Sequence, residues 1–262
     1  MIGNDHFVFD QGAASDVGCR REINEDSFLA QPTNGLWAVA DGMGGHAAGD
    51  FASQTIVAQL SSIGPTGSPE DQQARFMERL TRANDAILAH SAAVGRGSIG
   101  STVVSLLVHG HHFACIWSGD SRAYLFRDGA LVQQSRDHTE VRALLDAGVI
   151  TIEDALRWPR KNVITKAVGV TAEPECETVT GDIRADDFFL LCSDGLTEHL
   201  DDHDILSIMG SAPSSQSACD RMIAETLVRG AKDNVTVVAI RCLAAPPPEP
   251  GDEGADIMDD MA

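Results

Sequence analysis

Acidic residues stand at the ends of four apolar segments, and three of them have a glycine as direct neighbour. These residues are Asp41, Asp120, Asp194 and Asp233. Glycine allows the backbone to turn sharply and a ligand to approach closely. Carboxylates at the rim of a rigid sheet offer the hard oxygen ligands that Mg²⁺ and Mn²⁺ prefer. The pattern indicates a divalent metal site, which could activate water for hydrolysis.

A second interpretation stays open at this point, because Asp-Gly is also the commonest hairpin turn signal. Taken singly, each of the four acidic residues fits a turn better than a ligand position. Taken as a set, all at strand ends, they favour the metal site. The spacing along the chain does not itself show that the four carboxylates converge in space.

The elements that must position these residues are short strands and amphipathic helices. We expect strands at 36–40, 101–108, 112–118, 121–127, 130–133, 187–192 and 234–241, and helices at 47–62, 70–93, 138–147 and 215–230. The links 109–111 and 119–120 are too short for a crossover helix, so the three strands they join should pair antiparallel. This predicts an α+β class with antiparallel sheet covered by helices, and a doubly wound parallel sheet does not fit.

The charge of the chain restricts its partners. The formal net charge is −20, from 39 acidic and 19 basic residues. Such a field repels nucleic acid and anionic lipid, so we expect no nucleic-acid partner and no membrane partner. It also repels a phosphorylated substrate. An enzyme for phosphate esters with this charge would have to reverse its sign locally, and bound cations do so directly.

Location and redox state follow from features that the chain lacks. No stretch approaches the ~20 apolar residues that cross a bilayer. The N-terminus has no basic-then-apolar secretory pattern. The six cysteines are scattered without a CxxC pair, which favours reduced thiols over a disulfide framework or a zinc site. We therefore expect a cytoplasmic location and a monomeric chain.

The clearest boundary falls after Leu243. Residues 244–262 contain four prolines, six carboxylates and no basic residue. That composition cannot build a core, so we expect a disordered acidic tail that acts as a passive solubilising end rather than a docking peptide. Residues 1–243 should form one catalytic domain.

Eight short motifs follow one another across nearly the whole chain. They are SDVGCRREINEDSF (15–28), VADGMGGHAAGDFAS (39–53), GSTVVSLLV (100–108), WSGDSRAYLFRDG (117–129), RDHTEVRALLDAGVIT (136–151), NVITKAVG (162–169), LLCSDGLTEHL (190–200) and DNVTVVAI (233–240). With these motifs, in this order, the chain resembles the PPM family of metal-dependent protein phosphatases, also called type 2C, in its compact bacterial form. The resemblance implies a central antiparallel β-sandwich flanked by helical layers.

The resemblance also implies the ligands of a binuclear Mn²⁺ or Mg²⁺ centre. Asp41 should bridge two metals, with the Gly42 carbonyl oxygen on the second. Asp194 and Asp233 should complete the first metal. The second should be held by Glu25 and Asp26, directly or through water. Asp120 matches the residue that shares a third metal with Asp194 in bacterial members.

The activity implied is hydrolysis of phosphoserine and phosphothreonine in proteins. Two cations lower the pKa of a bridging water, and the resulting hydroxide attacks phosphorus in line with the leaving oxygen. Arg21 matches the arginine that binds the substrate phosphate, and its guanidinium fork suits two phosphate oxygens at once. No covalent phosphoenzyme is required, so the cysteines are not nucleophile candidates.

One position departs from some eukaryotic members, which have a histidine directly after the Asp-Gly pair. Here that position is Met43, and His46 follows three residues later, as in the bacterial form of the motif. His46 is a candidate general acid. A role in packing or in capping the following helix, or metal-bound water as the acid, remains open.

Residues 136–169 correspond to the family's flap, a mobile segment beside the active site that influences substrate choice. Its helix presents Val141, Leu144 and Leu145 on one face, which we assign to ordinary core packing. The segment 158–161 (Trp-Pro-Arg-Lys) is its most basic and aromatic part, and we expect it to contact phosphoprotein substrate.

Two alternatives to an active protein phosphatase remain. One is a catalytically weak module that binds phosphoprotein without turning it over, and the full set of acidic ligands argues against it. The other is a metal-dependent phosphoesterase for small phosphate esters. The leading hypothesis implies phosphorylated protein substrates and a cognate bacterial serine/threonine kinase whose action the enzyme opposes.

Overall fold

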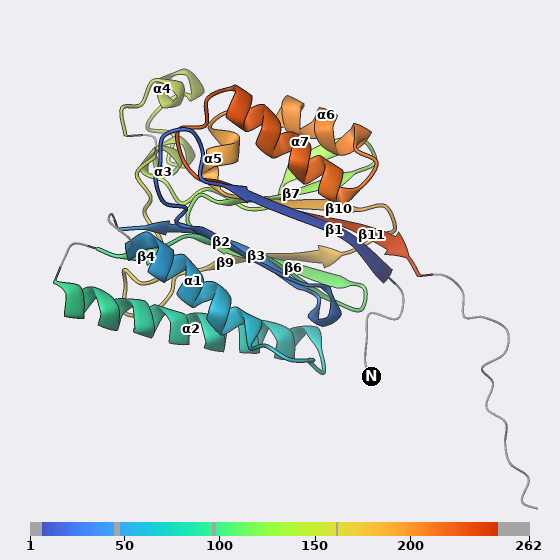
Figure 1. Cartoon of the computed structure of the whole chain (residues 1–262), viewed down its shortest axis with the longest axis horizontal. Coiled ribbons are helices and arrows are strands. Elements are labelled where there is room, and N and C mark those ends of the chain that lie inside the picture. The colour runs from blue at the N-terminus through green and yellow to red at the C-terminus, as the bar shows by residue number, and fades with distance from the viewer. Residues whose placement is uncertain (1–6, 45–47, 96–97, 161, 246–262) are drawn as a thin grey trace, which may run out of the picture.

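A computed structural model describes residues 7–44, 48–95, 98–160 and 162–245, and over these residues two antiparallel sheets pack face to face (Figure 1). The first sheet has the strand order β1 (Phe7–Asp16), β11 (Val235–Ala244), β10 (Phe188–Cys192), β7 (Arg122–Arg127) and β8 (Ala130–Gln133). The second has the order β2 (Asp26–Gln31), β3 (Leu36–Met43), β5 (Val103–His109), β6 (His112–Ser118) and β9 (Glu177–Asp182), with β4 (Gly100–Ser101) beside β3.

Helices cover both outer faces of this sandwich (Figure 1). The second sheet is covered by α1 (Ala48–Ser61) and α2 (Pro69–Val94), and the first by α5 (Asp194–Thr197), α6 (Asp202–Ser211) and α7 (Ser215–Val228). Two short helices, α3 (Glu140–Asp146) and α4 (Ile152–Leu156), lie at one end, and a 3-10 turn (Pro32–Asn34) joins β2 to β3. No helix among the described residues has the length and apolar character needed to span a bilayer.

The core consists of three apolar layers. The central layer lies between the sheets and includes Trp37 and Val104 from the second sheet and Phe189 and Val238 from the first, all fully buried. The other two lie between each sheet and its helices. Strands buried on both faces read as continuous apolar runs, which is why the segments 36–40 and 187–192 were recognisable as strands.

The predicted α+β sandwich is confirmed, but one predicted pairing is wrong. The strands expected at 112–118 and 121–127 were assigned to one hairpin. In the structure β6 pairs with β5 and β9, whereas β7 pairs with β10 and β8. The link 119–120 therefore carries the chain from one sheet to the other. Gly119 permits this corner with a φ of 111°, in the region that favours glycine.

Several elements carried no clear sequence signal. The edge strands β1, β2 and β9 contain many polar residues and are partly exposed, and α4 and α5 are one turn long. The residues of the expected acidic tail beyond position 245 lie outside the described residues, so the domain boundary at 243 stays a prediction.

Candidate metal centre

Two neighbouring strands place four of the expected ligands side by side. In the register of β2 and β3, the Cα of Asp26 lies opposite that of Asp41. The backbone N–H of Gly42 donates to the carbonyl oxygen of Glu25 over 3.1 Å. A side chain on Gly42 would collide with the backbone carbonyl of Gly49 at the start of α1, so this position requires glycine. β3 runs on through Asp41 and Gly42 to Met43 and does not end before them.

The first sheet contributes Asp194, at the start of α5 directly after β10, and Asp233, just before β11. Two hydrogen bonds join this end of the first sheet to the second. Ser193 Oγ donates to Asp26 Oδ2 over 2.8 Å, and Asn234 Oδ1 accepts from the Glu25 backbone N–H over 2.8 Å. The carboxylates that the sequence places far apart therefore meet at one end of the sandwich.

The carboxylates at this end of the sandwich are buried and repel one another. Burial raises the pKa of Asp41 well above its usual range, and repulsion from Asp26, Asp194, Asp120 and Asp233 raises it further. The pKa of Asp194 is raised well above its usual range too, by burial and then by Asp120, Glu198, Asp233 and Asp26. Burial also raises the pKa values of Asp26 and Asp120 to about 6. Both side chains are nearly excluded from solvent, each 8% exposed.

The chemistry of this donor set fits divalent cations. Asp26 Oδ1 is buried and has no hydrogen-bond partner among the described residues. A buried polar atom without a partner costs free energy unless a ligand satisfies it. Carboxylate and carbonyl oxygens of this kind suit Mg²⁺ or Mn²⁺, and a cation would also remove the repulsion among the carboxylates.

Arg21 lies at the exposed edge of the cluster. Its Nη2 donates to Asp233 Oδ2 over 2.6 Å, and the two side chains are 49% and 34% exposed. This hydrogen bond raises the pKa of Arg21, with smaller contributions from Glu25 and Asp41. The guanidinium thus faces the carboxylate cluster from solvent. Glu25 also has a partner, because its Oε1 accepts from the backbone N–H of Gly49 over 3.1 Å.

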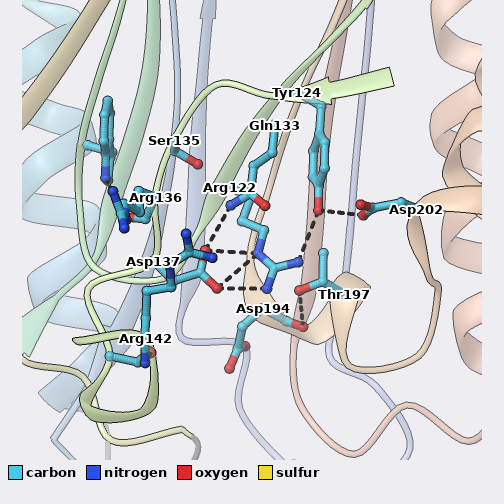
Figure 2. Close-up of polar contacts among 12 residues, drawn as sticks. Arg122, Tyr124, Gln133, Ser135, Arg136, Asp137, Arg142, Asp194, Thr197 and Asp202 are labelled. Atoms are coloured by element: carbon cyan, nitrogen blue, oxygen red, sulfur yellow. Dashed lines mark hydrogen bonds and ion pairs between the residues drawn. The ribbon is translucent and has the colours of Figure 1, made fainter. Parts of the chain in front are cut away.

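A half-buried ion pair near Asp120 was not foreseen from the sequence. Arg122 forms three hydrogen bonds of 2.7–3.1 Å with both carboxylate oxygens of Asp137. Figure 2 shows the same guanidinium bonded to Tyr124, whose hydroxyl donates to Asp202 over 3.2 Å. An arginine alternating with apolar residues in a buried strand was the available signal, since a buried charge needs a partner.

His138 ties the loop of Asp120 to the base of the flap. Its backbone N–H donates to the Gly119 carbonyl oxygen over 2.9 Å, and its Nδ1 accepts from the Gly119 N–H over 3.1 Å. The ring stacks on Trp117, and its Nε2 lies 3.0 Å from Glu177 Oε1. Because Nδ1 is the acceptor, Nε2 carries the proton and faces the carboxylate.

The apolar face predicted for the flap helix does not enter the core. No residue of α3 is buried, and Val141, Leu144 and Leu145 are half-buried. Val141 and Leu145 line a cavity of about 320 Å³ that also contains Asp120 and Asp194. The assignment of this face to core packing was wrong, because the helix lies beside the sandwich, where no sheet covers it.

Two other expectations concern residues that lie partly or wholly outside the described part of the chain. His46 lies outside the described residues, so its role as general acid stays a prediction. The same is true of Lys161 in the basic segment 158–161. Arg160 of that segment pairs with Glu140 over 3.0 Å and is 64% exposed, and its contact with substrate also stays a prediction.

Similarity to known proteins decides the family. The profile described as Protein phosphatase 2C matches residues 11–143 and 158–235, most of the chain. The chain belongs to the protein phosphatase 2C family. The serine/threonine protein phosphatase PstP of Mycobacterium tuberculosis is 39% identical over 234 residues, which are 88% of this chain. The chain spans 44% of the length of that relative.

Relatives of similar size and known structure agree with this family. The serine/threonine phosphatase stp of Listeria welshimeri is 32% identical over 234 residues, which cover 86% of this chain and 93% of stp. A solved structure of the catalytic domain of PstP in complex with two manganese ions superposes with a TM-score of 0.82 at 36% identity, covering 90% of this chain and 99% of that one. The resemblance read from the eight motifs is confirmed.

Proposed function

We propose that this protein phosphatase 2C domain hydrolyses phosphoserine and phosphothreonine in proteins at a centre that holds two Mn²⁺ or Mg²⁺ ions. One observation carries the proposal. Asp26, Asp41, Asp120 and Asp194 converge with raised pKa values at the end of the sandwich. A cation bound among buried carboxylates that repel one another would remove this repulsion. The manganese ions of the PstP structure support the same assignment.

The residues at the site have distinct roles in this proposal. Asp41, Asp194 and Asp233 would hold one ion, and Asp41, Glu25, Asp26 and the Gly42 carbonyl would hold a second. Asp120 and Asp194 would hold a third. When bound, these ions would supply a water of lowered pKa as the nucleophile.

Arg21 binds the phosphate that enters beside the cluster. Its hydrogen bond to Asp233 orients the guanidinium toward the site. Because the side chain is half exposed, its other N–H groups can donate hydrogen bonds to the oxygens of an incoming phosphate. A planar fork contacts two phosphate oxygens at once and stabilises the charge that builds up on them during transfer. Arg21 would therefore attract the substrate phosphate to the site although the protein as a whole is strongly acidic.

A thiol mechanism is disfavoured by the burial of the cysteine beside the site. Cys192 stands two residues before Asp194, and burial raises the pKa of its thiol to about 12. A thiol in that state is protonated at neutral pH and is a poor nucleophile. The proposed mechanism accordingly uses water as the nucleophile and has no cysteinyl-phosphate intermediate.

Hydrolysis of a phosphothreonine peptide tests the proposal. We expect turnover that requires Mn²⁺ and is lost in chelator and in Asp41→Asn. A folded protein that binds the peptide without turning it over would favour a regulatory module. Turnover of small phosphate esters but of no phosphopeptide would favour a general phosphoesterase. In a cell, we further propose that the enzyme opposes a serine/threonine kinase.

A further inference from the structure

The cavity of about 320 Å³ beside the metal centre has one apolar wall, provided by the flap. Val141 and Leu145 of α3 and Ile152 and Ala155 of α4 line this wall. Ile152 is 75% exposed, although it is among the largest apolar side chains of the flap. Exposed apolar surface that lines a hollow beside a reactive centre is typical of a binding site. The volume is at the lower end of ligand pockets and suits one long side chain.

The rest of the lining is largely acidic. It contains Asp120, Asp137, Asp194 and Glu198, with Arg122 as the cation that lines it. Arg122 donates to both carboxylate oxygens of Asp137, so these two charges cancel each other. Asp120 and Asp194 are candidate metal ligands. Among the carboxylates that line the cavity, Glu198 is neither paired with Arg122 nor a candidate metal ligand.

Glu198 is held in place but is not neutralised. Its Oε1 accepts from Asn162 Nδ2 over 2.5 Å, which joins the flap to α5 across the cavity. Within the part of the chain that the structure describes, no lysine, arginine or histidine forms an ion pair with it. Its backbone N–H donates to the Asp194 carbonyl oxygen over 2.8 Å, so it stands one helical turn from the metal centre.

We propose that this cavity is a subsite for a lysine or arginine that flanks the phosphorylated residue of the substrate. The proposal rests on the proposed function. The aliphatic stem packs against Val141, Leu145 and Ile152, and the cationic head lies at Glu198. Long basic side chains bury their stems on apolar surface while the charged end stays near water or a carboxylate. The cavity and the metal centre share Asp194, so a phosphorylated residue and its neighbour occupy them together.

Matched phosphothreonine peptides test the subsite. They carry lysine, norleucine, alanine or glutamate at one position, scanned from two residues before to two residues after the phosphothreonine. At the position that enters the cavity, we expect kcat/KM for lysine to exceed that for norleucine about three-fold, the range of a solvent-accessible ion pair. The kcat/KM for norleucine should in turn exceed that for alanine, because the norleucine stem contacts the apolar wall and alanine has no such stem. Glutamate should be the poorest substrate.

Two variants test the contributions of Glu198 and of the apolar wall separately. The quantity compared is the ratio of kcat/KM values between peptides, measured within each variant. Glu198→Gln keeps an acceptor for Asn162 and removes the charge, so the preference for lysine over norleucine should fall to about one. Leu145→Ala should lower the advantage of lysine and norleucine over alanine equally. Glu173→Gln removes one exposed charge outside the cavity and should leave every ratio unchanged.

Binding gives a second readout that does not depend on turnover. Dissociation constants of labelled peptides that carry a non-hydrolysable phosphonate in place of the phosphate, measured by fluorescence anisotropy with Mn²⁺, should show the same order and the same loss with Glu198→Gln. Equal kcat/KM for lysine and norleucine at every position, or a preference that survives Glu198→Gln, would overturn the subsite and leave the phosphatase assignment intact. Failure to turn over any phosphopeptide would overturn the proposed function and the subsite with it.

Discussion

Replacing Asp120 with asparagine should stabilise the metal-free protein at neutral pH. Asp120 is 8% exposed, and burial together with repulsion from Asp137 raises its pKa from 3.8 to about 6. Each pKa unit corresponds to about 1.4 kcal/mol, so the ionised carboxylate costs the fold up to about 3 kcal/mol at pH 7. Asparagine has nearly the same shape without the charge, and its amide faces the cavity.

The pH dependence gives this prediction its sign. The pKa of Asp120 is higher in the folded than in the unfolded chain, so the protonated carboxyl favours the fold. That contribution is full below about pH 3.8 and is lost as the pH rises through about 6. The advantage of Asp120→Asn should therefore be largest at pH 7 and should vanish near pH 4. Neighbouring carboxylates titrate together, so single replacements will not add.

Urea unfolding in chelator, followed by circular dichroism at pH 4 and pH 7, measures this difference. Asp85→Asn, on the exposed face of α2, is the matched control and should change stability little at either pH. With saturating Mn²⁺ the order should reverse, because the wild type gains binding free energy that the variant lacks in part. An Asp120→Asn protein no more stable than wild type in chelator at pH 7 would refute the electrostatic reasoning, and so would an equal gain at pH 4.

Three further substitutions test other parts of the site. Arg21→Lys should lower kcat/KM for a phosphopeptide about ten-fold, since one charge-assisted bond to phosphate is lost; unchanged steady-state kinetics would exclude the phosphate contact. Gly195→Ala should cost more than about 4 kcal/mol of unfolding free energy in urea, because a Cβ there would collide with the Asn234 carbonyl oxygen; a soluble variant of normal stability would contradict that packing. Asp137→Asn should cost about 3 kcal/mol in the same assay, because Arg122 keeps its charge in a half-buried position without a carboxylate; Gln73→Glu, a change of one charge on α2, is its control and should cost little.

The sequence predicts much of this fold because its central strands are buried on both faces. Segments such as 36–40 and 187–192 are continuous apolar runs, and α2 has a clear helical period together with a Ser68 cap. Edge strands could not be found in the same way. β1 and β9 are half-exposed and polar, and only pairing with β11 and β6 makes them strands.

The candidate ligands were recognisable as a set, but their convergence in space was not. An apolar run that leads into an aspartate followed by glycine marks Asp41 and Asp194 without any tertiary information. The pairing of Asp26 with Asp41 depends on strand register, which the sequence does not display. For the helix α3, the sequence pattern predicted a location that the structure does not have. Its apolar face has the spacing of a core helix, and only the structure places it at a cavity.

Activity measured against the number of bound Mn²⁺ ions tests the binuclear centre most directly. Metal content after equilibrium dialysis and hydrolysis of a phosphothreonine peptide would be followed in the same samples, for the wild type and for Asp41→Asn. We expect activity to rise steeply only as the second ion binds, and Asp41→Asn to lose both tight binding and turnover. Full activity with one ion per chain, or in the presence of chelator, would contradict the proposed centre.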